Sequence, residues 1–308
     1  MKKLIRFLIV NTICFTLVFT ASAQEKNWKL GVQMWTFHIS SFEKAIQRTD
    51  SAGLKYVEVY PGQRLYENST NYIDPAMPES DCKAMQKMLD EKGISIGAYG
   101  VLLCETEAEW KLNFDFAKKM HIPIITAEPK TEHLDVVNKL AKEYNIKVAI
   151  HDHPRPSLYW HPDSVYAAIK NRPYIGVCAD LGHWVRNGLN VMDCLKKLSG
   201  RIMVLHFKDV IRPEDVKLIS GEKGSADIKA SASNSESVSI SHSNPEEYID
   251  VRLGQGVCEI SSVLKELKKQ KFAGLFSMEH ETNWENNVTD LLYNKAFYYR
   301  ELKKLSAK

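Results

Sequence analysis

The chain has 308 residues, with 41 Lys and Arg residues against 38 Asp and Glu residues. Three of the basic residues lie in the first 23 positions, so the rest of the chain has 38 basic and 38 acidic residues. A chain with this balance lacks the basic surface expected of a protein that binds nucleic acid or an anionic membrane, and both partners are excluded. The length suits one large domain.

The first 23 residues have the layout of a secretory signal peptide. A basic start containing Lys2, Lys3 and Arg6 precedes an apolar stretch, and Ala21 to Ala23 have the small side chains of a cleavage site. The apolar stretch is short for a membrane-spanning helix, which needs about 20 residues. We therefore expect cleavage after Ala23, a mature chain of residues 24–308, and a periplasmic or secreted protein without membrane insertion.

From Lys29 onward, short apolar runs rich in β-branched residues alternate with longer amphipathic stretches. Near-continuous apolar runs are typical of strands that are buried on both faces of a parallel sheet. Eight runs have this character: residues 29–37, 56–61, 94–100, 122–129, 147–153, 175–183, 201–209 and 274–281.

Helical patterns lie between these runs. Residues 41–53, 79–93 and 134–145 end in Gly or Asn, which close a helix in the left-handed conformation, and residues 288–305 predict a long final helix. The alternation predicts a single-domain (β/α)8 TIM barrel, for which about 250 residues are typical. The alternative is an open doubly wound sheet, but no Gly-rich phosphate loop follows the first strand.

One segment breaks the alternation. Residues 220–244 are rich in Ser and poor in apolar residues, so they bury too little surface to join a core. They lie between the seventh and eighth predicted strands, where a barrel carries a loop on its catalytic face. We expect a long, partly disordered loop over residues 210–252, and an ordered lid is the alternative.

Titratable side chains recur at the carboxyl ends of the predicted strands, where barrels place their catalytic groups. Because residues two apart share a face of a strand, His151 and His153 point the same way and Asp152 points the other way. Four consecutive strands thereby offer two imidazoles and two carboxylates, a set that suits one divalent ion of Mn, Co, Zn, Fe or Mg. The predicted ligands are His151, Asp180, His206 and Glu279.

Six motifs resemble those of the xylose isomerase-like TIM barrel superfamily, which groups sugar isomerases and epimerases with endonuclease IV-type enzymes. They are VEVYPG (57–62), IHDHP (150–154), CADLGH (178–183), LHFKD (205–209), LGQG (253–256) and SMEHE (277–281), and the resemblance covers essentially all of the chain after residue 23. In the epimerases one ion is held by Glu, Asp, His and Glu. The resemblance places the last three on Asp180, His206 and Glu279, whereas His151 replaces the first Glu.

This departure affects the mechanism that the resemblance implies. The epimerases move protons with two carboxylates, and only Glu279 remains here. We expect a metal-dependent sugar isomerase or epimerase that removes a proton beside a carbonyl and passes through an enediolate. The predicted catalytic residues are Glu279, Glu128, His153 and Lys208, with His151 as a further candidate base, and the predicted substrate contacts are His183, Glu58, Trp35 and Tyr60.

Two other functions stay open at this point. A lyase or hydratase would eliminate across C1–C2 of a 3-keto-glycoside from the same enolate, and a non-catalytic exported barrel would only bind sugar. An endonuclease would need a basic DNA-facing surface, which the neutral charge argues against. The expected partner is a small carbohydrate, and the sequence leaves the oligomeric state open.

Overall fold

The computed structural model describes residues 27–216 and 248–307. The predicted signal peptide and the Ser-rich segment 220–244 lie outside the described residues, and both stay predictions. Within the described ranges, no helix combines the length and the apolar character that crossing a membrane requires.

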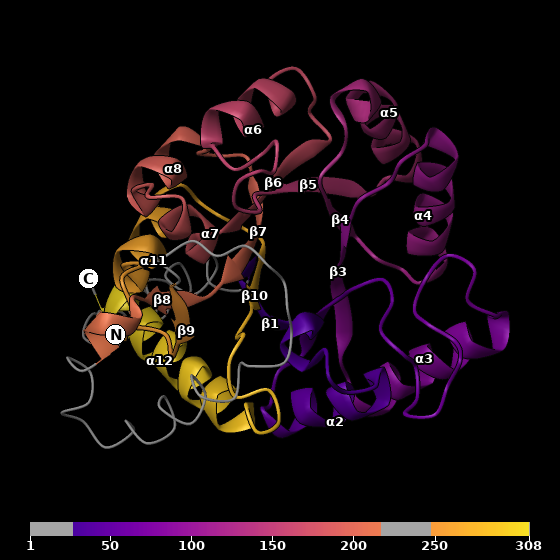
Figure 1. The fold of residues 1–308 in the computed structure, drawn as a ribbon, viewed down its shortest axis with the longest axis horizontal. Helices are drawn as coiled ribbons and strands as arrows, with labels where there is room; N and C mark the ends of the chain where they lie inside the picture. Colours follow the sequence, from indigo (N-terminus) through magenta and orange to yellow (C-terminus); the bar gives the residue numbers. More distant parts are fainter. Residues whose placement is uncertain (1–26, 217–247, 308) are drawn as a thin grey trace, which may run out of the picture.

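Parallel strands close into a barrel, which confirms the predicted fold (Figure 1). Each strand pairs with its neighbours in the order β1-β2-β3-β4-β5-β6-β7-β10, and β10 pairs with β1. The strands are β1 (Lys29–Gln33), β2 (Tyr56–Val59), β3 (Ser95–Leu102), β4 (Ile124–Ala127), β5 (Lys147–His151), β6 (Ile175–Asp180), β7 (Ile202–Phe207) and β10 (Leu275–Met278).

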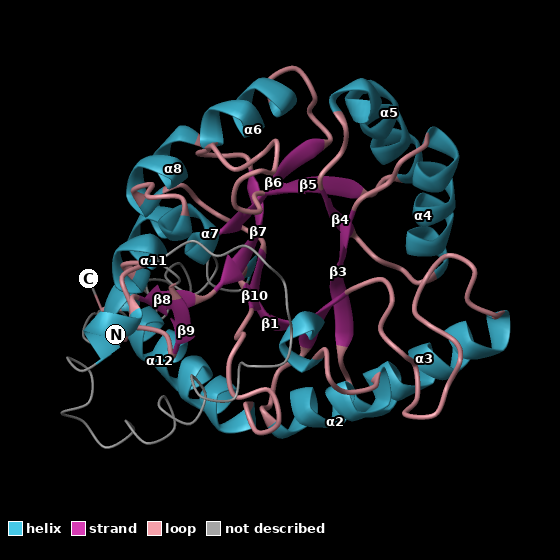
Figure 2. Ribbon diagram, viewed as in Figure 1, coloured by secondary structure: helices cyan, strands magenta, loops and turns pink. Residues whose placement is uncertain are grey.

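The helices form a ring outside the barrel (Figure 2). Gly93 and Asn145 close two of them in the left-handed conformation, as predicted, with φ of 58° and 54°. The α-helices are α2 (Phe42–Ser51), α3 (Glu79–Lys92), α4 (Glu107–Lys119), α5 (Leu134–Tyr144), α6 (Pro162–Ile169), α7 (Leu181–Arg186), α8 (Val191–Lys197), α11 (Ile260–Lys269) and α12 (Val288–Ser306). Short 3-10 helices are η2 (Met34–Phe37), η3 (Thr131–His133) and η4 (Pro213–Asp215).

The strands end earlier than the apolar runs predict. β5 ends at His151 rather than at residue 153, and β10 ends at Met278, so Glu279 follows the strand. β6 ends at Asp180 because the carboxylate of Asp180 caps α7, accepting a hydrogen bond from the backbone N–H of His183 at 2.8 Å. His151, Asp180 and His206 therefore lie at or next to the last residues of their strands, whereas Glu279 begins the loop that follows β10.

A small apolar layer fills the barrel just below these polar ends. It consists of Ala98, Ala149, Cys178, Val204 and Leu275. Three of these residues precede His151, Asp180 and His206 by two positions, which places the polar side chains on the same inward face, one layer nearer the carboxyl ends. The interior thus has an apolar floor beneath a polar layer.

Both ends of the segment predicted as one long loop pair with each other. β8 (Asp209–Ile211) and β9 (Ile249–Val251) form a two-stranded antiparallel sheet apart from the barrel, so paired strands stand at both ends of the connection between β7 and α11. The Asp209 carboxylate also accepts hydrogen bonds from the backbone N–H groups of Gly254, Gly256 and Cys258 at 2.8–3.0 Å. Asp209 therefore fixes the LGQG turn beside the end of β7.

A second buried carboxylate holds the other side of this turn. Asp290 accepts hydrogen bonds from Arg252 at 2.7 Å and from Asn283 at 3.0 Å. His280 and these two partners outweigh the effect of burial and lower the pKa of Asp290 to about 2. The carboxylate consequently stabilises the fold in its charged form.

The effect of Asp290 on stability is expected to depend on pH. Because its pKa is lowered on folding, its contribution is complete above the unfolded value of about 3.9 and is lost as the pH falls toward about 2. We compare the unfolding free energy of the wild-type protein with that of Asp290→Asn. The difference between them should be about 2 kcal/mol larger at neutral pH than at a pH of about 2. Denaturant unfolding at stepped pH measures this; a difference that is constant with pH would contradict it.

Candidate metal centre and active site

The four predicted ligands converge at the carboxyl ends of β5, β6, β7 and β10. His206 Nδ1 lies 3.1 Å from His151 Nε2, 3.6 Å from Asp180 Oδ2 and 3.0 Å from Glu279 Oε2. His151 Nε2 lies 3.8 Å from the same Asp180 oxygen. Ligand atoms bound about 2.1 Å from a tetrahedral ion lie about 3.4 Å apart, so the spacing fits a metal centre.

The two carboxylate oxygens of this group also fit a bound cation. Asp180 Oδ2 and Glu279 Oε2 are buried and accept no well-aligned hydrogen bond. Burial by itself would raise the pKa of Glu279, but the charges of Lys208 and His206 outweigh it and lower that pKa to about 2. Lys208 and His183 likewise hold the pKa of Asp180 below its usual range against the effect of burial. Two buried anions facing two imidazoles form a donor set that suits a divalent ion.

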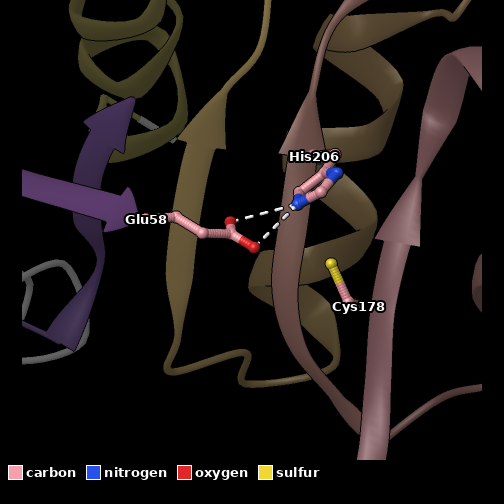
Figure 3. A group of neighbouring side chains, drawn as sticks. All are labelled: Glu58, Cys178 and His206. Carbon is pink, nitrogen blue, oxygen red and sulfur yellow. Dashed lines mark hydrogen bonds and ion pairs between the residues drawn. The ribbon is translucent and has the colours of Figure 1, made fainter. Parts of the chain in front are cut away.

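Glu58 contacts the ring of His206 at Nε2 (Figure 3), and Nδ1 of the same ring faces Glu279. Both of its carboxylate oxygens lie 3.0–3.1 Å from His206 Nε2, and Thr126 Oγ1 donates a hydrogen bond to one of them at 2.7 Å. This carboxylate–histidine pair leaves Nδ1 for a metal ion. Glu58 is completely buried, so it fits an orienting role better than the substrate contact that the sequence suggested.

Cys178 is the third member of this deeper group (Figure 3). Its thiol is fully buried, and burial raises its pKa, which keeps it protonated. Asp180, His206 and Glu279 bring their ligand atoms close together, and His151 lies beside Asp180 and His206, so this cluster is the candidate metal site.

Glu128 gathers a second group beside the first. Its carboxylate contacts His153 Nδ1 and lies 3.4 Å from His151 Nδ1, and Ser157 Oγ donates to it at 2.7 Å. The side chain of His153 is 45% exposed, whereas that of His151 is 1% exposed. The structure thus places His153 nearer the mouth than His151, as the alternation implied. Partial burial and the neighbouring His151 lower the pKa of His153, which favours its neutral form.

Asp152 occupies the other face of the chain, as predicted. Its carboxylate is buried and accepts a hydrogen bond from the backbone N–H of Asp180 at 2.8 Å. It supports the backbone of a candidate ligand without joining the cluster. Its role was not apparent from the sequence, because the bond joins two strands whose register the sequence does not reveal.

His183 and Lys208 lie beside Asp180. The rings of His151 and His153 each have their centroids 5.3 Å from that of His183, and His183 Nδ1 lies 3.4 Å from Asp180 Oδ2. Lys208 is enclosed by carboxylates and is only 1% exposed. His183 is therefore placed to reach a molecule at the cluster, whereas Lys208 is covered.

Aromatic side chains border the mouth on the β1 and β2 side. Trp35 follows β1, is 38% exposed, and stacks on His38 with ring centroids 4.8 Å apart. Tyr60 follows β2 and meets Trp35 edge to face, and His38 in turn meets Trp284. Trp160 lies in the loop after β5, where Arg155 stacks on it. Trp35 and Tyr60 are thus grouped with each other but come from different strands than the ligands.

Comparisons with known proteins agree with this architecture. A family model described as xylose isomerase-like TIM barrel matches residues 46–297, and no curated protein matches the chain. A solved structure of an uncharacterized protein from Parabacteroides distasonis is 30% identical, with a TM-score of 0.65 over 89% of this chain and 99% of that one.

Two more distant structures share the fold. A D-tagatose 3-epimerase-like protein is 15% identical, with a TM-score of 0.64 over 91% of this chain and 98% of that one. The probable 3-DHS dehydratase from Bacillus anthracis is 16% identical, with a TM-score of 0.58 over 90% of this chain and 98% of that one. At these identities the likeness establishes architecture alone.

Proposed function

Because this chain belongs to the xylose isomerase-like TIM barrel family, we propose that it is a metal-dependent sugar isomerase or epimerase. The observation that carries the proposal is the pair of buried oxygens, Asp180 Oδ2 and Glu279 Oε2, that face His206 Nδ1 without a well-aligned hydrogen bond. Epimerases of the same fold support a carbohydrate substrate. The export of the protein is also part of the proposal and rests on residues 1–23 of the sequence.

The cluster supplies the binding half of this function. His151, Asp180, His206 and Glu279 would hold one divalent ion, and Glu58 would keep the ring of His206 in place. Such an ion, when bound, polarises carbonyl and hydroxyl oxygens and stabilises an enediolate. The exposed face of Trp35 offers an apolar surface for the C–H face of a sugar ring.

The paired Glu128 and His153 supply the proton transfer. With His153 Nδ1 occupied by Glu128, Nε2 is the nitrogen available to substrate, and a neutral imidazole oriented by a carboxylate is an effective general base. Glu279 is a weaker candidate, since Lys208 and His206 lie 3.1 Å and 3.0 Å from its Oε2. We therefore assign to His153 the removal of the proton from the carbon beside the carbonyl.

A lyase or hydratase acting on a 3-keto-glycoside is the second candidate. Epimerisation needs proton-moving groups on both faces of the substrate, and here His151 stands where the epimerases have one of their two carboxylates. Elimination needs a base that removes the proton and an acid that protonates the leaving aglycone, but it does not need groups on both faces of one carbon. The probable 3-DHS dehydratase of the same fold supports this candidate.

Solvent deuterium exchange is expected to identify the reaction. The metal-loaded protein, screened with free and 3-keto sugars in D2O, should incorporate deuterium at the carbon beside the carbonyl. Exchange without release of an aglycone supports the isomerase, and release of an aglycone supports the lyase. If the screen finds neither exchange nor release, and if chelator does not affect sugar binding, the result supports a non-catalytic sugar-binding barrel.

A further inference from the structure

Lys208 is a fully buried cation at the edge of the metal cluster. It follows β7, and its Nζ lies 3.2 Å from Asp180 Oδ2 and 3.1 Å from Glu279 Oε2. A third carboxylate oxygen, Glu281 Oε1, accepts a hydrogen bond from it at 2.6 Å. The lysine is therefore held by three carboxylates rather than by solvent.

The two oxygens nearest Lys208 are the same two that face the imidazoles. His206 Nδ1 lies 3.6 Å from Asp180 Oδ2 and 3.0 Å from Glu279 Oε2, so the oxygens have a nitrogen of the ligand set on one side and the ammonium on another. A divalent ion held by these oxygens would have the ammonium as a close neighbour. Like charges at such a distance repel strongly where water is excluded.

Local packing keeps the lysine in this position. Gly182, in the first turn of α7, leaves the space that the alkyl chain of Lys208 fills, since a Cβ there would lie 2.7 Å from its Cδ. Glu281 is fixed as well, because its backbone N–H donates to Asp250 at 3.1 Å, and Arg186 pairs with Asp250 at 2.7 Å. These contacts hold the ammonium beside the cluster.

We propose that Lys208 is a built-in cation that shares Asp180 and Glu279 with the divalent ion. It weakens binding of the ion by repulsion, and it stabilises the metal-free fold by pairing with two buried anions. Lys208 is in this sense a positioning residue that acts through the two carboxylates. The proposal rests on the metal site of the proposed function.

Calorimetric titration of the metal-free protein with Mn²⁺ and with Zn²⁺ tests this. Lys208→Met removes the charge and retains an unbranched apolar side chain, and it should bind each ion at least about tenfold more tightly than wild type. Without metal it should also unfold at a lower temperature, and added ion should restore the loss. Lys55→Met is the matched control, because Lys55 pairs with Asp50 on the surface and should leave metal affinity unchanged.

A second variant changes Glu281, the third carboxylate that contacts Lys208. Glu281→Gln removes the outer carboxylate and leaves the full charge of Lys208 on Asp180 and Glu279, so ion binding should weaken about fivefold or more. This variant decides the question if Lys208→Met does not fold. A wild-type protein that binds no ion overturns the proposed function itself. A wild type that binds ion, with Lys208→Met no tighter or Glu281→Gln no weaker, overturns only the role of Lys208.

Discussion

The Asp180→Asn variant is expected to lose its divalent ion and at least about 1,000-fold in turnover. The substitution is nearly isosteric. Its amide oxygen can still accept the hydrogen bond from the backbone N–H of His183 that caps α7, so the local fold is retained. What disappears is the anionic oxygen that faces His151 and His206. Loss of one anionic ligand should weaken ion binding roughly 100-fold or more, since removing even an outer-shell partner costs about 10–100-fold.

Elemental analysis and activity with the substrate found by the exchange screen measure the effect together. Asp290→Asn is the matched control: it also removes a buried carboxylate, but one that pairs with Arg252 outside the cluster, so it should reduce stability and retain the ion. An Asp180→Asn protein with one equivalent of ion and wild-type turnover would show that the cluster is not the metal centre.

The barrel could be predicted because its signal is local. Strands buried on both faces are read as apolar runs, and left-handed residues such as Gly93 and Asn145 mark helix ends within a single turn of chain. The same signal overestimates strand length. The run from Ile175 to His183 was predicted as one strand, but β6 ends at Asp180. The carboxylate of Asp180 caps α7 there, so a helix begins where the pattern predicted more strand.

The ligand set could be predicted for a related reason. The period of two puts His151 above Ala149 and His206 above Val204 on the inward face, and parallel strands bring their carboxyl ends to one rim. The partners of these ligands could not be predicted in this way. The contact of Glu58 with His206 crosses 148 positions of chain, so it depends on the closure of the barrel rather than on any local pattern.

Lys208 and the β8–β9 pair show a further limit. The sequence predicted Lys208 as a catalytic residue, but the structure encloses it, and Gly182 leaves room for its alkyl chain. β8 and β9 have only three residues each, too few for a periodic signal. In both cases the outcome depends on a contact between distant residues.

Substitution of His153 by Gln is expected to lower turnover about 100- to 10,000-fold while the bound ion is retained. The physical reason is that His153 offers the exposed nitrogen near the cluster, whereas His151 is buried with both ring nitrogens in contact with the ligand set or with Glu128. Glu128→Gln should lower turnover less than His153→Gln, because it removes the group that orients the base and leaves the base itself. The double variant should resemble His153→Gln alone, since Glu128 acts through His153.

Deuterium exchange and ion content distinguish this assignment from its rivals. His161→Gln provides the control, as His161 is a histidine that caps α6 and lies outside the cluster, and it should retain exchange. If His153→Gln keeps wild-type exchange, the base is another residue, and a Glu279→Gln variant that binds ion but no longer exchanges would point to Glu279. If both single variants lose exchange and keep the ion, two groups move protons on the substrate. That result would fit epimerisation, which needs a proton-moving group on each face of the substrate, and release of an aglycone would then decide for elimination.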